Sequence, residues 1–264
     1  MSKWKYSVYK QKYNGIVYYK YYIILLLALI LIYFGIESDE DYTESIKTRT
    51  IEKDGFCVLY NKIYSDKTTG PACPELSNDI LSILPADYIF IDYVYKIQNA
   101  ALSTFHRDVT SSQHINNTKH PVYTLILYKY DGELLSICPK SNQSYPFVWS
   151  RIVNIRGKKG TVFLFDSNIL HAGCINKCTY RNVIQYKLCH KSDLSKLSTL
   201  QGVNMKKSQK CDNSIYNIIL RKLSYYFEFP INYIFTPLLI KREGSNTIIG
   251  KIQSLIPMNY YNNY

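Results

Sequence analysis

Three residues of metal-binding types, His106, Asp108 and His171, stand at two places in the middle of the chain. His106 and Asp108 are separated by one residue, and in a strand such residues project from the same face. His171 follows the apolar run 160–166 after a short turn, and small residues come after it. Two imidazoles and one carboxylate form the facial set that binds Fe(II) and leaves coordination positions open. We therefore predict an iron(II) site made by these three residues.

Arg181 lies ten residues after His171, at the start of an apolar stretch that we predict to be a strand. A turn between antiparallel strands can return this side chain to the neighbourhood of the metal. A guanidinium pairs with a carboxylate through two parallel hydrogen bonds. Arg181 therefore indicates a carboxylate-bearing co-substrate beside the predicted iron site.

Two other interpretations of the residues in this region are less well supported: a kinase catalytic loop and a metal-binding role for Asp166. His106-Arg107-Asp108 matches the catalytic loop of protein kinases, but Gln113 stands where that loop has asparagine, and the chain has no glycine-rich phosphate loop. Asp166 precedes the turn before His171, and an aspartate there is more typical of a turn acceptor than of a metal ligand.

The elements that must position these residues are mainly short strands. Apolar and polar residues alternate between turn residues over much of the chain, a pattern that favours a β-sandwich or barrel. Apolar residues at helical spacing predict flanking helices. The predicted strands are 56–60, 88–97, 121–130, 133–138, 147–155, 160–166 and 181–188, and the predicted helices are 74–84 and 215–227.

The N-terminal region predicts a membrane anchor. Residues 21–36 carry no charge, and extension back to residue 15 gives a stretch interrupted only by Lys20, long enough to cross a bilayer. A cleaved signal peptide is the alternative, but no small-residue cleavage pattern follows Ile36. We divide the chain into a basic tail (1–14), a transmembrane anchor (15–36), an acidic linker (37–50), a domain with the predicted iron(II) and co-substrate site (51–200) and a C-terminal helical extension (201–264).

Charge predicts how such an anchor is oriented. Five of the 32 basic residues lie in the first 20 positions, whereas acidic residues follow the apolar stretch. The positive-inside rule then puts the N-terminus in the cytoplasm and the domain in a lumen or outside the cell, as a single-pass protein. The glycosylation triplets at Asn116 and Asn142 are compatible with that side.

The remaining basic residues, in a chain of net charge +12, form no stripe with interleaved aromatics, so we expect no nucleic-acid partner. All seven cysteines follow the predicted anchor. Cys174 and Cys178 are the closest pair, and they are either a disulfide or two loop thiols.

Over residues 51–190 the chain resembles the iron(II)/2-oxoglutarate dioxygenases, most of all the branches around phytanoyl-CoA dioxygenase and prolyl 4-hydroxylase. The stretches that carry the resemblance are FHRDVTSS, YTLILYKYDGELLSICP, VNIRGKKGTVFLFDSNILHAG and RNVIQYKL. Small anchored versions also resemble proteins of large DNA viruses. The resemblance implies a double-stranded β-helix (jelly roll), in addition to the predicted transmembrane helix.

The resemblance also implies roles for residues. His106, Asp108 and His171 would bind iron, and Arg181 would bind the distal carboxylate of 2-oxoglutarate. The implied reaction hydroxylates an unactivated C–H bond of an unidentified protein, lipid or glycan with release of succinate and CO2, and ascorbate is a candidate additional cofactor. A second co-substrate contact is expected from an early strand, where Tyr123, Thr124 and Tyr128 are the candidates. Thr124 and Tyr128 share one face, and Tyr123 is on the other.

Two departures from the family pattern keep other functions open. Arg181 stands where the prolyl hydroxylase branch usually has lysine, which favours the phytanoyl-type branch, and Val183 replaces a serine or threonine found in many relatives. A catalytically inactive jelly-roll ectodomain used for assembly or attachment predicts that the three metal-binding residues do not converge. A metal site that does not use 2-oxoglutarate predicts that Arg181 points away from them.

Overall fold

The structure is a computed structural model of the chain. It describes residues 18–30, 36–40, 47–59, 64, 72–99, 104–174, 181–207 and 215–228. The chain divides into two compact units, Met1–Ile36 and Glu37–Tyr264.

In the first unit, residues 18–30 are helical and their large apolar side chains are exposed. Within the described part of the chain, no helix has the length and apolarity that crossing a bilayer requires. Residues 1–17 and 31–35 lie outside the described residues, so the basic tail and both ends of the predicted anchor do too. The anchor remains a prediction.

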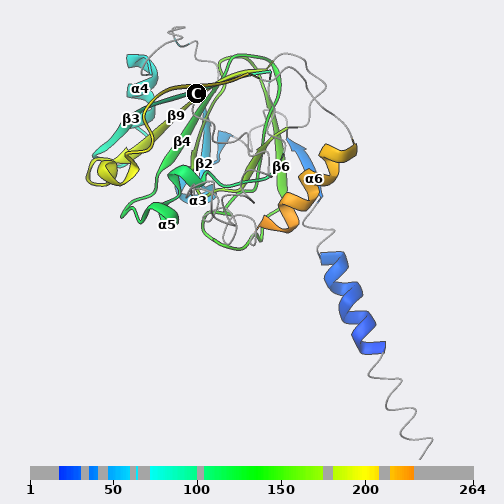
Figure 1. Ribbon diagram of the computed structural model, residues 1–264. Coiled ribbons are helices and arrows are strands. Elements are labelled where there is room, and N and C mark those ends of the chain that lie inside the picture. Colours follow the sequence, from blue (N-terminus) through cyan, green and yellow to red (C-terminus); the bar gives the residue numbers. More distant parts are fainter. Residues whose placement is uncertain are drawn as a thin grey trace, which may run out of the picture. The chain divides into compact units, whose positions relative to one another are not determined.

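The second unit is built from two β-sheets that face each other (Figure 1). The larger sheet has the order β10-β3-β9-β4-β7-β2 and the smaller one β1-β6-β5-β8. The strands are β1 (Glu37–Glu40), β2 (Phe56–Leu59), β3 (Tyr88–Gln98), β4 (Tyr123–Tyr128), β5 (Gly132–Ile137), β6 (Ile152–Gly157), β7 (Val162–Asp166), β8 (His171–Gly173), β9 (Asn182–His190) and β10 (Gly202–Lys207). The helices are α3 (Ile51–Asp54), α4 (Pro74–Leu81), α5 (Gln113–Asn116) and α6 (Ile215–Tyr226), with 3-10 segments η1 (Val109–Ser111) and η2 (Lys191–Leu197).

The order of the strands is that of a jelly roll. The chain passes from β3 in the larger sheet to a single bridge at His106 beside β8, then to β4, to β5 and β6, to β7, to β8 and finally to β9. β9 pairs with both β3 and β4 in the larger sheet, and β8 pairs with β5 in the smaller sheet. These two consecutive strands therefore connect the two sheets. The predicted class, mainly β with flanking helices, is confirmed.

Alternation in β4 shows how the sequence separates the two faces of the larger sheet. Ile126 and Tyr128 pack between the sheets against side chains of β5, β6 and β7. Leu125 and Leu127 face the other way, in the cluster that contains Leu76 of α4. Thr124, which shares the face of Ile126, therefore points into the space between the sheets.

Several boundaries shift by one to three residues, and three regions differ by more. Residues Glu37–Glu40, predicted as part of a linker, form β1, because Ser38 donates to the carbonyl of Ile152 and Glu37 pairs with Arg221 of α6. Gly202–Lys207, predicted within a helical extension, form β10 parallel to β3. The predicted strand 147–155 begins only at Ile152, since turns occupy the preceding residues.

Candidate metal and co-substrate site

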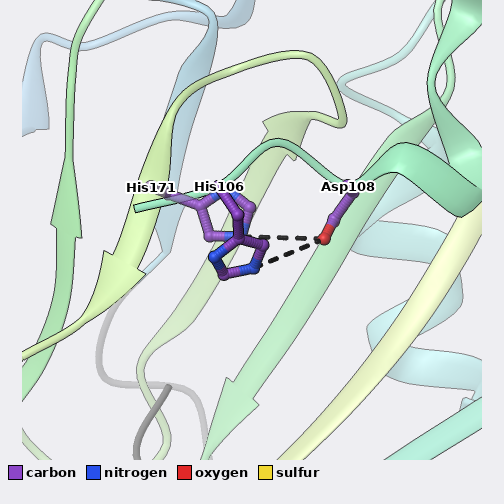
Figure 2. A group of neighbouring side chains, drawn as sticks. All are labelled: His106, Asp108 and His171. Carbon is purple, nitrogen blue, oxygen red and sulfur yellow. Dashed lines mark ion pairs between the residues drawn. The ribbon is translucent and has the colours of Figure 1, made fainter. Parts of the chain in front are cut away.

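His106, Asp108 and His171 converge, as Figure 2 shows. Their candidate ligand atoms all lie within 4.8 Å of one another. Asp108 Oδ1 is 4.0 Å from His106 Nε2 and 3.7 Å from His171 Nε2. Metal bonds of about 2.0–2.2 Å allow one ion to touch two donors up to about 4 Å apart. Both distances from Asp108 therefore fit one metal ion shared with each imidazole.

A backbone bridge places the two imidazoles side by side. His106 N donates to His171 O at 2.9 Å, and His171 N donates to His106 O at 3.0 Å. The two ring centroids are 4.5 Å apart as a result. Asp108 does not continue this strand: its backbone turns (φ −75°, ψ 78°) into η1. The convergence of His106 with Asp108 was predicted for a strand, but a bend after the bridge produces it.

Both imidazoles are held with Nε2 toward the site. His106 Nδ1 lies 3.0 Å from the carbonyl of Thr104, and His171 Nδ1 lies 3.0 Å from the carbonyl of Ile169. A ring whose Nδ1–H donates to a carbonyl presents an Nε2 lone pair to a metal. Burial lowers the pKa of His171 to about 3, and the neighbouring His106 acts in the same direction. His171 is therefore neutral, as a ligand must be.

The two carboxylate oxygens of Asp108 have different surroundings. Oδ1 faces the imidazoles, whereas Oδ2 accepts from Lys187 Nζ and from the Thr124 hydroxyl, both at 2.6 Å. Burial alone would raise the pKa of Asp108, but the charge of Lys187 and its hydrogen bond outweigh burial and hold this pKa well below the usual range. Burial lowers the pKa of Lys187, against the effect of Asp108.

This arrangement gives Thr124 a contact that the sequence analysis did not predict, and its predicted contact with the co-substrate stays a prediction. The Thr124 hydroxyl contacts Asp108, Lys187 and Ser167, so it holds the candidate metal ligand. Lys187 was missed altogether. The signal was present in the sequence, because a lysine inside the apolar strand RNVIQYKL needs a buried partner.

Arg107, between the two candidate ligands, points to the opposite side. Its guanidinium is fully buried, pairs with Glu228 and donates to the carbonyls of Asn168 and Ser141, the latter at 2.8 Å. Glu228 lies after α6, Asn168 lies between β7 and β8, and Ser141 lies between β5 and β6. Arg107 therefore fixes the His106–Asp108 segment from behind, while the ligands face the space between the sheets.

Arg181 and Tyr128 form a second polar site between the sheets. Arg181 is 5% exposed, and its Nε has no hydrogen-bond partner among the described residues; the same holds for the buried Tyr128 hydroxyl. Burial raises the pKa of Tyr128, and the nearby charge of Arg181 opposes the rise. Val183, which shares the face of Arg181, lies opposite Tyr128 in the register. A buried cation and a hydroxyl with unused bonding capacity fit a bound carboxylate.

The site has an open side. The His106 side chain is 29% exposed, in contrast to 5% for His171, so small molecules can approach the metal position from that side.

Asp166 is the predicted turn acceptor: its carboxylate accepts from the backbone and side chain of Asn168 and from Asn142. Cys174 is a buried free thiol, and Cys178 lies outside the described residues.

Comparison with known proteins gives only distant likenesses. No family model and no curated protein matches the chain. Among solved structures, HygX from Streptomyces hygroscopicus with nickel and 2-oxoglutarate bound is 13% identical (TM-score 0.39), and the match covers 53% of this chain and 84% of HygX. EctD from S. alaskensis with bound Fe is 15% identical (TM-score 0.39), with 63% of this chain and 90% of EctD covered.

Two further matches, EvdMO1 and AviO1 from Streptomyces viridochromogenes Tue57, are 18% and 15% identical, with TM-scores of 0.36 and 0.35. Each match covers 45% of this chain, and the chain spans only 31% of EvdMO1 and 58% of AviO1. Likenesses this weak do not establish membership of a family.

Proposed function

We propose that this protein is an Fe(II)-dependent oxygenase that uses 2-oxoglutarate as co-substrate and hydroxylates a protein, lipid or glycan. The observation that carries the proposal is the convergence of two Nε2 atoms and one carboxylate oxygen within 4.8 Å. Each imidazole is oriented through its Nδ1, and Asp108 through Oδ2. A facial set of two histidines and one carboxylate suits Fe(II) and leaves positions for a chelating oxoacid and oxygen.

The residues divide into two groups by what they would bind. His106, Asp108 and His171 would hold the iron, which supplies the oxygen-activating chemistry. Arg181 would pair with the distal carboxylate of 2-oxoglutarate, and the Tyr128 hydroxyl would donate to the same group, which satisfies both buried polar atoms. Succinate and CO2 would be the co-products, and ascorbate the reductant tested first for an effect on turnover.

The two alternatives have less support. An ectodomain without catalysis predicts metal-binding residues that do not converge, but they do. A metal site without 2-oxoglutarate gives no reason for a buried guanidinium beside a buried hydroxyl, both with unused bonding capacity among the described residues.

Substrate-uncoupled turnover tests the proposed activity. Full-length protein with Fe(II) and 2-oxoglutarate should release succinate, and His171→Ala should abolish both the release and the binding of Co(II). Arg181→Met should keep Co(II) binding but lose 2-oxoglutarate binding. Equal succinate release by the wild type and His171→Ala, with no metal bound by either, contradicts the proposal.

We also propose that the protein works at a membrane, through the predicted anchor, with its domain lumenal or exterior. The exposed apolar side chains of residues 18–30 support this proposal. So does α6, whose polar residue Arg221 pairs inward with Glu37 while its apolar face is exposed. That face consists of Ile215, Ile218, Ile219, Leu223 and Tyr226. An exposed apolar helix face is typical of a helix that lies in a membrane interface.

Membrane fractionation and protease protection of the full chain test this second proposal. We expect the protein to sediment with membranes, to resist carbonate extraction and to be cleaved only from the non-cytoplasmic side. Protease protection is preferable to glycan mapping, because the side-chain amides of Asn116 and Asn142 already donate hydrogen bonds within the domain. Ile219→Glu should reduce protection of α6 by lipid, in contrast to Val203→Glu on β10. Extraction of the wild type by carbonate excludes the anchor.

A further inference from the structure

We propose that Lys187 is a positioning residue for the metal site: it holds Asp108 Oδ2 so that Oδ1 alone is presented to the metal. The inference rests on the proposed metal site but goes beyond it, because Lys187 is no ligand and lies on another strand. The Lys187 side chain is 2% exposed, and a lysine so deeply buried requires a specific partner.

The ammonium group of Lys187 is fully used by three acceptors. Nζ donates to Asp108 Oδ2 at 2.6 Å, to Thr124 Oγ1 at 2.7 Å and to Ser111 Oγ at 2.9 Å. A lysine ammonium has three hydrogens. Lys187 therefore has no donor left for a co-substrate or substrate, and its function is directed toward Asp108.

The same contacts decide which oxygen of Asp108 can bind a metal. Oδ2 accepts from both Lys187 and Thr124, whereas Oδ1 lies 3.7 Å from His171 Nε2. A carboxylate whose outer oxygen accepts two short hydrogen bonds offers one oxygen to a metal. Coordination through one oxygen preserves the open positions that an oxoacid and oxygen require.

The residues around Lys187 come from separate parts of the chain. Thr124 lies in β4 directly opposite Lys187 in β9, and Ser111 ends η1, the segment that follows Asp108. Asp108 stands after a backbone bend, outside any strand, and its N–H donates to the carbonyl of Ser167 at 2.9 Å, which holds the backbone but leaves the carboxylate free to rotate. Lys187 and Thr124 therefore supply the orientation that the backbone does not.

A purely electrostatic role predicts a different result from an orienting role. If Lys187 only balanced charge, its removal would relieve repulsion of the divalent ion, and the metal would bind more tightly. If Lys187 orients Asp108, its removal weakens metal binding. Partners in this position typically contribute 10- to 100-fold to metal affinity.

The test measures the Kd of Co(II) alone for the full-length protein by calorimetry, with the Co(II) absorption spectrum as a second readout. Lys187→Met should raise the Kd about 10- to 100-fold and change the spectrum. Thr124→Val, which removes the second donor to Oδ2, should raise it roughly 2- to 10-fold. Lys191→Met, which breaks the exposed pair with Asp87, is the matched control and should leave both readouts unchanged.

The outcomes separate this inference from the proposed function. Co(II) binding by the wild type, lost in His171→Ala but unchanged or tighter in Lys187→Met, overturns the role of Lys187 and leaves the metal site intact. Absence of Co(II) binding by the wild type overturns both. If Lys187→Met does not fold, Thr124→Val decides, and an unchanged Kd in that variant refutes the inference.

Discussion

Replacement of Tyr128 by phenylalanine should have opposite effects on stability and on co-substrate binding. The Tyr128 hydroxyl is buried and has no hydrogen-bond partner among the described residues. Such a group costs roughly 1–3 kcal/mol. We expect Tyr128→Phe to stabilise the metal-free protein by about 1 kcal/mol, which raises Tm by roughly 2–4 °C in a domain of this size.

The same variant should bind 2-oxoglutarate less tightly. A hydrogen bond to a charged group contributes about 1.5–3 kcal/mol. Its loss corresponds to a rise in Kd of about 10- to 150-fold. The measurement is calorimetric titration of the Co(II)-loaded protein with 2-oxoglutarate, beside urea unfolding of the metal-free form.

Tyr130→Phe is the control for Tyr128→Phe. The Tyr130 hydroxyl donates to the carbonyl of Glu133 at 2.8 Å, and the two rings are neighbours. Loss of that satisfied bond should destabilise the protein by about 1 kcal/mol and leave the Kd unchanged. If Tyr128→Phe destabilises the protein as Tyr130→Phe does, or leaves the Kd unchanged, the assignment of Tyr128 to the carboxylate is refuted.

Three further predictions concern the supports of the fold. Gly55→Ala should cost roughly 1–3 kcal/mol in urea unfolding, because φ is +80° and a Cβ would lie 2.4 Å from an amide oxygen. Burial alone would raise the pKa of Glu37, but the hydrogen bonds and charge of Arg221 outweigh burial and lower this pKa from 4.5 to about 2. Its contribution to stability should be complete above about pH 4.5 and lost as the pH falls toward 2, and acid unfolding of Glu37→Gln should lack this component. Arg107→Met should cost about 3–5 kcal/mol because it breaks the buried ion pair with Glu228, and the double variant with Glu228→Gln should lose less than the sum.

Patterns within a single strand predicted the fold well, whereas pairing between distant segments escaped prediction. β4, β7 and β9 alternate or are continuously apolar, so their sequences indicate strands without knowledge of their neighbours. β1 and β10 are polar edge strands, and only their partners β6 and β3 make them strands. Such pairings are tertiary, and local propensity does not contain them.

For the site, residue type and spacing identified three residues that converge in the structure, but gave an incomplete reason for their convergence. His106 and Asp108 were expected to share a strand face, yet Asp108 converges through a bend. Thr124 was expected to contact the co-substrate because it shares a face with Tyr128, and that shared face is observed. The alternation of side chains along a strand does not tell how far each residue lies from the metal site. In the structure, Thr124 lies beside Asp108.

The inner face of the β9 segment carries two cationic side chains, Arg181 and Lys187. They differ in their hydrogen-bond partners, and this difference indicates different functions. Arg181 and Lys187 are both basic, both buried and of the same parity, but their surroundings differ. Lys187 has three acceptors from the protein, one of which is Asp108. Arg181 retains a buried Nε without a partner among the described residues. Because a buried donor without a partner is unfavourable, the end of the strand at Arg181 gains most from an added carboxylate, whereas the end at Lys187 is already complete.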